Sequence, residues 1–284
     1  MILVTGASGT VGSVLVEALV AGGHAFRAAY HSPEKAEKAR SEGVDAVLLD
    51  FAAPETLPPG LAGIETVFLL GTGVRGQIEG ETNVVKAAKA AGVKRLVKQS
   101  VWRAADEGYA LAKMHRAIER AVEVSGMAWT FLRPNGFMQN FAQDMAESIK
   151  TEGAMSLPAA DTRISHIDVR DIARVAARVL TEPGHEGKAY ELSGPEALAY
   201  GDAADILSRV LGKKITYTAL TDEGARAAMP GAGLPDFYVD IMIDLFRAYR
   251  KGMASQVTPD VKLVTGREAI TFEQFVQDHA GAFR

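Results

Sequence analysis

The chain has 284 residues, of which 48% are hydrophobic and 23% are charged, and its formal net charge is −4. This composition is typical of a globular protein with one large or two modest domains. The negative balance, without any basic run, argues against nucleic-acid binding, and the lack of cysteine excludes disulfides, thiolate catalysis and zinc–thiolate sites. No apolar stretch approaches the roughly 20 residues of a membrane span and no signal segment precedes the first strand, so we expect a cytoplasmic protein.

The first expected element is an apolar strand over residues 2–5, followed at once by Gly6, Gly9 and Gly12 at G-x-x-G-x-x-G spacing. Apolar residues then recur at helical spacing as far as Gly22. A strand, a tight glycine turn and a helix N-terminus together are typical of a dinucleotide site. Glycine lets the backbone approach the diphosphate, and the unpaired N–H groups of the helix face its negative charge. The alternative is a merely structural turn between strand and helix.

Strands and helices alternate through the first half of the chain. Further strands are expected near residues 24–30, 44–50, 65–70, 94–99 and 128–133, separated by helices near 33–41, 79–91 and 109–125. The prolines between Pro54 and Gly60 predict a loop or short turn there. This alternation predicts an α/β fold with a doubly wound parallel sheet covered by helices on both faces.

After Pro134 the pattern changes and predicts a second, smaller α/β lobe. An amphipathic helix is expected at 168–180, and strand 188–192 is expected to extend the first sheet. The lobe is expected to contain helix 202–211, strand 214–218 and helix 236–250. We assign residues 1–134 plus about 164–192 to the nucleotide-binding domain, and residues 135–163 plus 193–284 to the smaller, interleaved lobe. The cleft between the two is expected to hold a small-molecule substrate.

Five stretches of the chain resemble one known family: residues 4–12, 83–94, 130–140, 185–192 and 271–275. On these, the chain resembles an atypical short-chain dehydrogenase/reductase of the NmrA-like branch, and it is especially similar to NAD(P)H-dependent quinone, azo-dye and triphenylmethane-dye reductases. The resemblance implies an NAD(P)-binding Rossmann domain and hydride transfer to a quinone or related electron-poor aromatic acceptor, in a monomer or homodimer. Because the branch also includes members that only sense the nucleotide, a non-catalytic NAD(P)-sensing regulator is the alternative.

The end of the second strand bears on the choice between NAD(H) and NADP(H). An NAD-selective site usually places an Asp or Glu there to bind the ribose 2′-hydroxyl. This chain has no carboxylate at that point, and the resemblance places His31 where many NADPH-using relatives carry an arginine. We expect His31, Ser32 and Lys35 to accept the 2′-phosphate of NADP(H). If Glu34 turns inward and Lys35 is solvated, NAD(H) serves equally well.

Residues at the ends of several strands complete the predicted cofactor site. We expect contacts to NAD(P) from Thr5, Gly6, Ser8, Gly9, Thr10, Val11, Gly12, His31, Lys35, Asp50, Phe51, Leu70, Gly71, Thr72, Pro134, Asn135 and Phe137. The resemblance implies that Asp50 accepts from the adenine amino group, that Pro134 and Asn135 fix the nicotinamide carboxamide, and that Phe137 faces the substrate. The alternative for these positions is an ordinary residue at a strand end.

The sequence leaves the catalytic groups open. Tyr109 and Lys113 match the tyrosine and lysine, four residues apart, that carbonyl-reducing short-chain dehydrogenases use to move a proton. Projected on a helix, however, these two residues share a side with Arg116 and Arg120. We therefore interpret that side as a solvated basic face, with the catalytic pair as the alternative.

His115 and Glu119 match a His-x-x-x-Glu step of the dye and quinone reductases and can pair as i,i+4 neighbours, either to orient the imidazole or to secure the helix. An electron-poor acceptor needs no protein acid, because solvent can supply the proton after hydride transfer. The protein then chiefly aligns acceptor and nicotinamide in an apolar slot. Candidates for that slot are Trp102, Phe137, Met138, Phe141, Met229 and the Gly/Pro bend at 229–235. The alternative is that these are ordinary core or surface residues. The other histidines lack ligand spacing, so we expect no metal.

Overall fold

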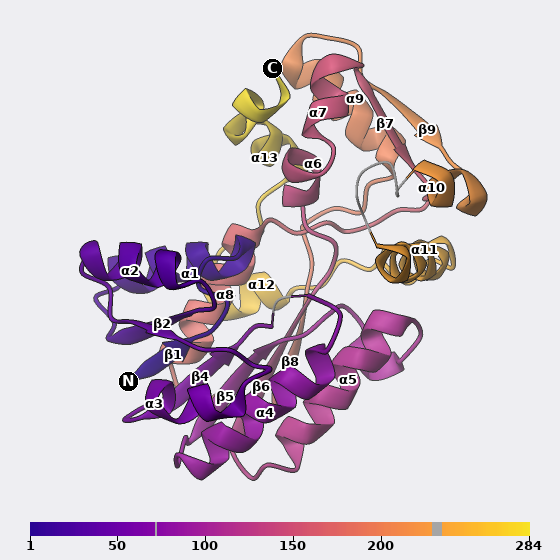
Figure 1. The fold of residues 1–284 in the computed structure, drawn as a ribbon. Helices are drawn as coiled ribbons and strands as arrows, with labels where there is room; N and C mark the ends of the chain where they lie inside the picture. The colour runs from indigo at the N-terminus through magenta and orange to yellow at the C-terminus, as the bar shows by residue number, and fades with distance from the viewer. Residues whose placement is uncertain (72, 229–234) are drawn as a thin grey trace.

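A computed structural model of the chain describes all residues except 72 and 229–234. Its main sheet has seven parallel strands in the order β3-β2-β1-β4-β5-β6-β8 (Figure 1). The strands are β1 (Ile2–Val4), β2 (Phe26–Tyr30), β3 (Ala46–Leu48), β4 (Thr66–Leu69), β5 (Arg95–Gln99), β6 (Ala128–Pro134) and β8 (Lys188–Leu192). This topology confirms the predicted doubly wound sheet. Its strand order reverses between β1 and β4, the point where such folds bind ligands.

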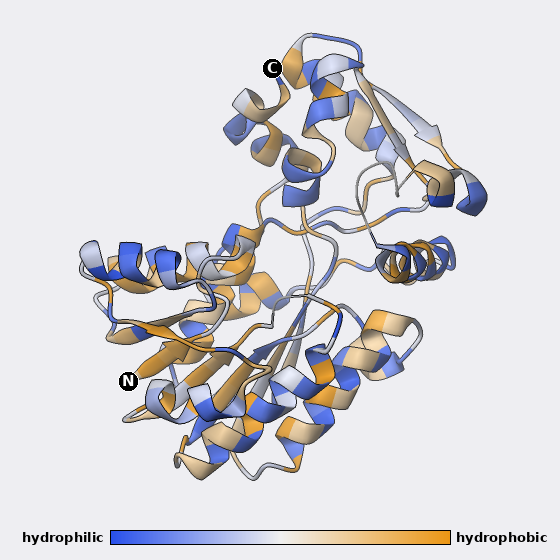
Figure 2. Ribbon diagram, in the orientation of Figure 1, coloured by the Kyte–Doolittle hydropathy of each residue, from blue (hydrophilic) through white to orange (hydrophobic). Residues whose placement is uncertain are grey.

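Helices cover both faces of the sheet (Figure 1). One face carries α1 (Thr10–Ala21), α2 (Pro33–Ser41) and α8 (Val169–Thr181), and the other carries α3 (Leu57–Leu61), α4 (Gln77–Ala90) and α5 (Ala110–Glu123). Side chains of the strands alternate between the two cores: Val97 packs in the core beside α1 and α8, and Leu96 packs in the core beside α4. The central strands β1 and β4 are therefore apolar along almost their whole length, whereas β2, β5, β6 and β8 also carry charged residues (Figure 2).

The segment between Pro54 and Gly60 begins with a short turn, as one of the two predicted alternatives has it, but the rest of it is helical, which was not predicted. A 3₁₀ turn at Pro54–Thr56 leads directly into α3. Pro58 and Pro59 lie in the first turn of α3, where a missing N–H donor costs little because those donors have no partner inside the helix. The leucines at both ends of α3 are fully buried against the sheet, so tertiary packing stabilises this short helix.

A second, smaller body lies beyond the carboxyl edge of the sheet (Figure 1). It contains a two-stranded parallel sheet of β7 (Ala154–Leu157) and β9 (Thr216–Ala219). Its helices are α6 (Gln139–Gln143), α7 (Ala146–Thr151), α9 (Tyr200–Leu211), α10 (Asp222–Ala228), α11 (Asp236–Arg250), α13 (Phe272–Asp278) and the 3₁₀ turn η4 (Ala280–Phe283). The predicted elements α9, β9 and α11 are confirmed, whereas β7 and the short helices were not predicted.

One segment of the C-terminal half returns to the main sheet. Helix α12 (Asp260–Thr265) packs on α8 and β8, and Val261 is part of the core beneath α1 and α8. This differs from the predicted boundary, which assigned all of 193–284 to the smaller lobe. Residues 188–192 form the edge strand β8 of the main sheet, as predicted.

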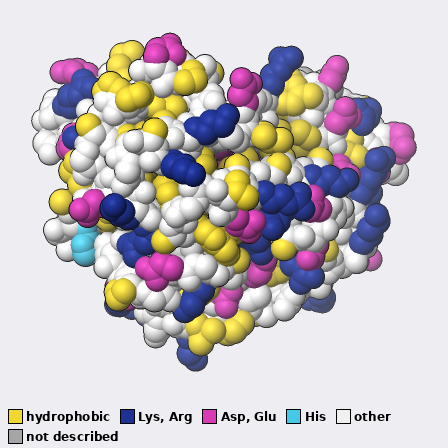
Figure 3. Space-filling model, turned by 90° about the horizontal axis from the view of Figure 1, so that it is seen from below, with side chains coloured by type: hydrophobic (Ala, Val, Ile, Leu, Met, Phe, Trp, Pro, Cys, Tyr) yellow, Lys and Arg dark blue, Asp and Glu magenta, His cyan; other side chains and the backbone are white. Residues whose placement is uncertain are grey.

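The surface mixes charges of both signs. Figure 3 shows lysine and arginine interspersed with acidic side chains over the face seen from below. Among the described helices, none has both the length and the hydropathy needed to cross a bilayer.

His166 is buried where the two bodies meet. It precedes Ile167, which forms an isolated bridge with Phe137, and its ring lies edge-on to Phe141 at 5.2 Å and to Tyr200 at 5.6 Å. Burial lowers the pKa of His166 to about 4, so the imidazole is neutral near pH 7.

This burial predicts an acid sensitivity. Between about pH 6.5 and pH 4 the unfolded chain binds a proton at His166 that the folded chain does not, so the free energy of unfolding falls as the pH falls, by about 3 kcal/mol at the lower end. Urea denaturation at several pH values should show that His166→Gln removes this part of the slope, whereas His24→Gln, at an exposed position, keeps it. A wild-type slope in His166→Gln would contradict the prediction.

Candidate functional site

The turn between β1 and α1 brings two stretches of backbone into close contact. Gly6 has a φ of +63°, a conformation that favours glycine, and a Cβ added to Gly12 would lie 2.0 Å from the Gly6 carbonyl oxygen. Gly9 is the N-cap residue of α1, and within the described residues no side chain caps the N–H groups of the first turn. The amino end of α1 therefore presents backbone donors, the arrangement that binds phosphate groups.

Thr5 fixes this turn to the end of β4. Its Oγ1 accepts a hydrogen bond from the backbone N–H of Leu70 at 2.8 Å. The single hydroxyl hydrogen is shared between the carbonyl oxygens of Phe68, at 3.0 Å, and Leu70, at 3.1 Å. Thr5 is fully buried, so these bonds are shielded from water and hold the two strand ends together.

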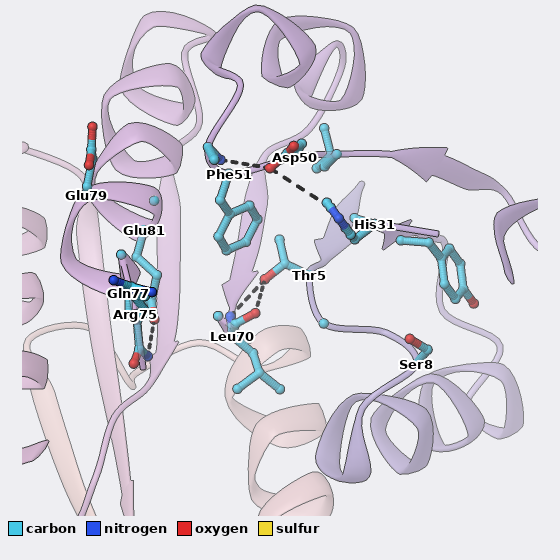
Figure 4. A pocket seen from close by; sticks show the side chains of 18 residues that line it. Thr5, Ser8, His31, Asp50, Phe51, Leu70, Arg75, Gln77, Glu79 and Glu81 are labelled. Carbon is cyan, nitrogen blue, oxygen red and sulfur yellow. Dashed lines mark hydrogen bonds and ion pairs between the residues drawn. The ribbon is translucent and has the colours of Figure 1, made fainter. Parts of the chain in front are cut away.

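The two strand ends border a cleft of about 490 Å³ at the carboxyl edge of the sheet (Figure 4). The predicted cofactor residues that line it are Thr5, Gly6, Ser8, His31, Asp50, Phe51, Leu70 and Gly71. The predicted residues outside its lining are Gly9, Thr10, Val11, Gly12, Lys35, Pro134, Asn135 and Phe137. Thr72 and Met229 lie outside the described residues. The structure thus brings about half of the predicted residues to one cleft, and every contact to a cofactor stays a prediction.

The predicted 2′-phosphate site is spread over three environments. His31 lines the cleft, with its Nδ1 4.0 Å from Oδ1 of Asp50. Ser32 caps α2, because its Oγ accepts from the backbone N–H of Lys35 at 3.3 Å. The Lys35 side chain is exposed in the first turn of α2. Of the three residues, His31 is therefore the one placed at the cleft itself.

A buried ion pair that we did not predict from the sequence supports the side of the cleft formed by Gly71 and Gln77. Lys98 and Glu81 are fully buried, and Nζ of Lys98 lies 2.5 Å from Oε2 of Glu81. Gln77 Nε2 donates to Oε1 of Glu81 at 2.7 Å, and a Cβ added to Gly71 would lie 2.6 Å from that same oxygen. The pair thus positions Gln77 and Gly71 at the cleft. The signal in the sequence was a lysine inside the apolar strand 95–99, which indicates a buried charge with a partner.

The predicted pair between His115 and Glu119 is not formed. Both carboxylate oxygens of Glu119 accept from Arg133, at 2.9 and 2.7 Å. Burial would raise the pKa of Glu119, but these bonds hold it below its ordinary value. His115 Nε2 instead lies 3.4 Å from Gln77 Nε2, and Nδ1 has no partner within the described part of the chain. Burial and the nearby Lys98 lower the pKa of His115 well below its usual range, so this imidazole is neutral.

Tyr109 and Lys113 lie in different environments. Tyr109 precedes α5 in an extended conformation, with a φ of −153°, and its side chain is 3% exposed. Its hydroxyl donates to the carbonyl oxygen of Trp102 at 2.6 Å, and burial raises its pKa. The prediction of a solvated basic face is therefore wrong for Tyr109 and right for the exposed Lys113. Nothing in this geometry makes the two a catalytic pair.

The apolar residues proposed for an acceptor slot are mostly core. Trp102, Met138 and Phe141 are at most 1% exposed, which contradicts an open slot made of these side chains. Trp102 Nε1 donates to the carbonyl oxygen of Met253 at 2.8 Å, and so ties the end of β5 to the C-terminal half. Phe137 is half-buried and remains a candidate for contact with an acceptor.

Asn135 supports the turn after β6. Its Nδ2 donates to Ser165 Oγ and to the carbonyl oxygen of Ala254, each at 2.9 Å. Its Oδ1 accepts from the backbone N–H of Gly136, also at 2.9 Å. The amide is thus engaged inside the protein, and its predicted contact with a nicotinamide stays a prediction. Within the described chain no group of three or more acidic or histidine side chains has the geometry to hold a metal ion.

Comparisons with known proteins show which proteins the chain is similar to. The model of the NmrA-like family matches residues 1–270. The NAD(P)H azoreductase of Xenophilus azovorans is 38% identical over 284 residues, which cover 100% of this chain and 99% of that protein. The NADPH complex of an Escherichia coli NADPH-dependent quinone oxidoreductase superposes with a TM-score of 0.90 and 30% identity over 100% of both chains. The NADP(H) complex of Citrobacter sp. triphenylmethane reductase has a TM-score of 0.88 and 29% identity, over 98% of this chain and 99% of that one.

The buried ion pair yields a stability prediction. Lys98→Met leaves the Glu81 carboxylate buried without its counter-ion, and should lower the free energy of unfolding by about 3–5 kcal/mol. The double variant Lys98→Met/Glu81→Leu should be more stable than the single one, because it removes both charges. Lys113→Met, at an exposed position, serves as the control and should cost less than about 0.5 kcal/mol in urea denaturation. A double variant less stable than Lys98→Met would contradict this account.

Proposed function

The chain belongs to the NmrA-like family, and from this premise we propose that it is an NAD(P)H-dependent oxidoreductase that reduces a quinone or a related electron-poor aromatic acceptor. The observation that carries the proposal is the cleft beside the uncapped amino end of α1, at the edge of the sheet where doubly wound folds bind dinucleotides. The similar proteins from Xenophilus, Escherichia coli and Citrobacter support it, since all three are reductases.

The residues of the cleft fit a nicotinamide dinucleotide. The glycine turn would receive the diphosphate, and Asp50 and Phe51 would border the adenine. We propose a preference for NADP(H), with NAD(H) also accepted, because β2 ends without a carboxylate and His31 lines the cleft at that end. When bound in reduced form, the nicotinamide supplies the hydride.

The protein's own part in the reaction is to bind, align and exclude water. Tyr109 is engaged with a backbone carbonyl and His115 is a buried neutral imidazole, so neither is poised to protonate an acceptor. An electron-poor acceptor takes up the hydride and then a proton from solvent, which requires no protein acid. This favours quinones, azo compounds and cationic triaryl dyes over simple ketones as acceptors.

We further propose the division of labour between the two bodies. Residues 1–134 plus about 164–192 would bind the cofactor, and residues 135–163 plus 193–284, apart from α12, would shape the acceptor side. The protein is expected to act in the cytoplasm as a monomer or homodimer, and the lack of cysteine is compatible with a reducing compartment.

Steady-state assays test the proposed reaction. Purified protein should oxidise NADPH, and more slowly NADH, when a quinone, an azo dye or a triphenylmethane dye is present, and should not do so with a simple ketone. The loss of reduced-nicotinamide absorbance measures the rate. Tight binding of NADPH without turnover on any acceptor would instead indicate a nucleotide sensor, and failure to bind either dinucleotide would reject both functions.

A tyrosine variant tests the absence of a protein acid. Tyr109→Phe should keep kcat with a quinone within about twofold of wild type, while losing about 1 kcal/mol of stability with the bond to the Trp102 carbonyl. Lys113→Gln, at the lysine of the same tyrosine–lysine motif, is the matched control and should change neither kcat nor stability. A drop in kcat of about 100-fold or more in Tyr109→Phe would restore the tyrosine mechanism.

A further inference from the structure

One cation borders the cleft, and it was not among the residues predicted from the sequence. Arg75 is the one lysine or arginine among the described residues that line it. It follows β4 between Gly73 and Gly76, and its side chain is exposed. The lining has three acidic residues. Glu81 is neutralised by Lys98, Asp50 lies 4.0 Å from His31, and the exposed Glu79 forms no ion pair with Arg75 among the described residues. The diphosphate of a dinucleotide carries two negative charges, and Arg75 has the only guanidinium among the described residues of the lining, so it can serve as a counter-charge.

Arg75 is held in place by the C-terminal half of the chain. Its guanidinium carbon lies 5.7 Å from the ring centroid of Phe237, within the range of a cation–π contact. Phe237 is the second residue of α11, and its side chain is 40% exposed. Helix α11 also contacts the cofactor-binding body elsewhere, since Asp244 accepts from the backbone N–H of Ala110 at 2.6 Å. Stacking on Phe237 restricts the arginine before any ligand arrives, which reduces the entropy lost on binding.

The position of Arg75 favours contact with the diphosphate of the cofactor over contact with its 2′-phosphate. In Figure 4 it lies beside Gln77 and Glu81 on one side of the cleft, whereas Ser8 of the glycine turn lies on the other. His31, which borders the end of β2 where a 2′-phosphate is expected, lies away from it. A diphosphate at the amino end of α1 would therefore lie between the helix and Arg75.

We propose that Arg75 binds the diphosphate of the nicotinamide cofactor, opposite the amino end of α1, and that Phe237 links this contact to the C-terminal lobe. The inference rests on the proposed dinucleotide site, and it adds a cofactor-binding residue and a route by which cofactor binding stiffens the acceptor side. Because the diphosphate is common to both cofactors, Arg75 contributes equally to NADPH and NADH. His31, in contrast, contributes to NADPH alone.

Calorimetric titration of the full-length protein with NADPH and with NADH tests the phosphate assignment. Arg75→Gln should weaken both by about tenfold or more, and by the same factor, because a charge-assisted bond to the diphosphate is lost. Arg75→Gln should also make Kd depend less on salt concentration. The affinity of Arg75→Lys for each cofactor should fall between those of wild type and Arg75→Gln. Lys86→Gln is the matched control, since it removes an exposed cation of α4 outside the cleft lining, and should leave both affinities within about twofold.

A double-mutant cycle tests the link to the lobe. Phe237→Ala should weaken both cofactors by about two- to fivefold, the scale of an exposed cation–π contact. Added to Arg75→Gln, it should have no further effect, because the ring acts through the guanidinium.

Each contrary result rejects a defined part of the inference. A loss confined to NADPH in Arg75→Gln would move Arg75 to the 2′-phosphate, and unchanged affinity for both cofactors would remove it from the site. Additive effects of the two substitutions would reject the role of Phe237. The wild-type titration tests the proposed function separately. If wild type binds the dinucleotides and the variants bind them equally well, the inference about Arg75 is overturned and the proposed function stands.

Discussion

The close approach of α1 to the turn after β1 is the constraint on which the rest of the site depends. A side chain at Gly12 would meet the Gly6 carbonyl at 2.0 Å, so the helix can lie this close only without a Cβ. Thr5 then joins that turn to the end of β4 through bonds to Leu70. Because both strand ends border the cleft, this side of it is fixed by the backbone of the turn and by the buried Thr5 side chain. A rigid amino end of α1 is what lets backbone N–H groups meet a diphosphate without reorganisation.

Buried charges extend this rigid frame to the remainder of the molecule. Lys98 and Glu81 hold the wall formed by Gly71 and Gln77. On the neighbouring strand, Arg133 bridges Glu119 of α5 and Glu191 of β8. Such pairs cost desolvation energy, so we do not attribute the stability of the fold to them. Their effect is positional: each carboxylate accepts a specific set of donors, which fixes how α4, α5 and β8 sit against the carboxyl edge of the sheet.

The sequence predicted what depends on local pattern and missed what depends on packing between distant segments. Apolar runs and glycine spacing were sufficient for the parallel sheet and for the turn at Gly6. Helical projection was wrong for Tyr109 because that residue precedes α5 in extended backbone, where a 100° period has no meaning. Phe141 is buried in the core of the second body itself, and Trp102 is buried where it bonds to Met253 of the C-terminal half. Arg75 has no local signal at all, since its role follows from the ring of Phe237, more than a hundred residues away in the chain.

A crystal structure of the protein with NADPH would test the central claim most directly. The account predicts that the diphosphate accepts hydrogen bonds from backbone N–H groups at the amino end of α1, with the adenine bordered by Asp50 and Phe51 and the nicotinamide extending toward the ends of β5 and β6. A dinucleotide bound elsewhere on the molecule, or bound here with its diphosphate away from that helix end, would contradict it.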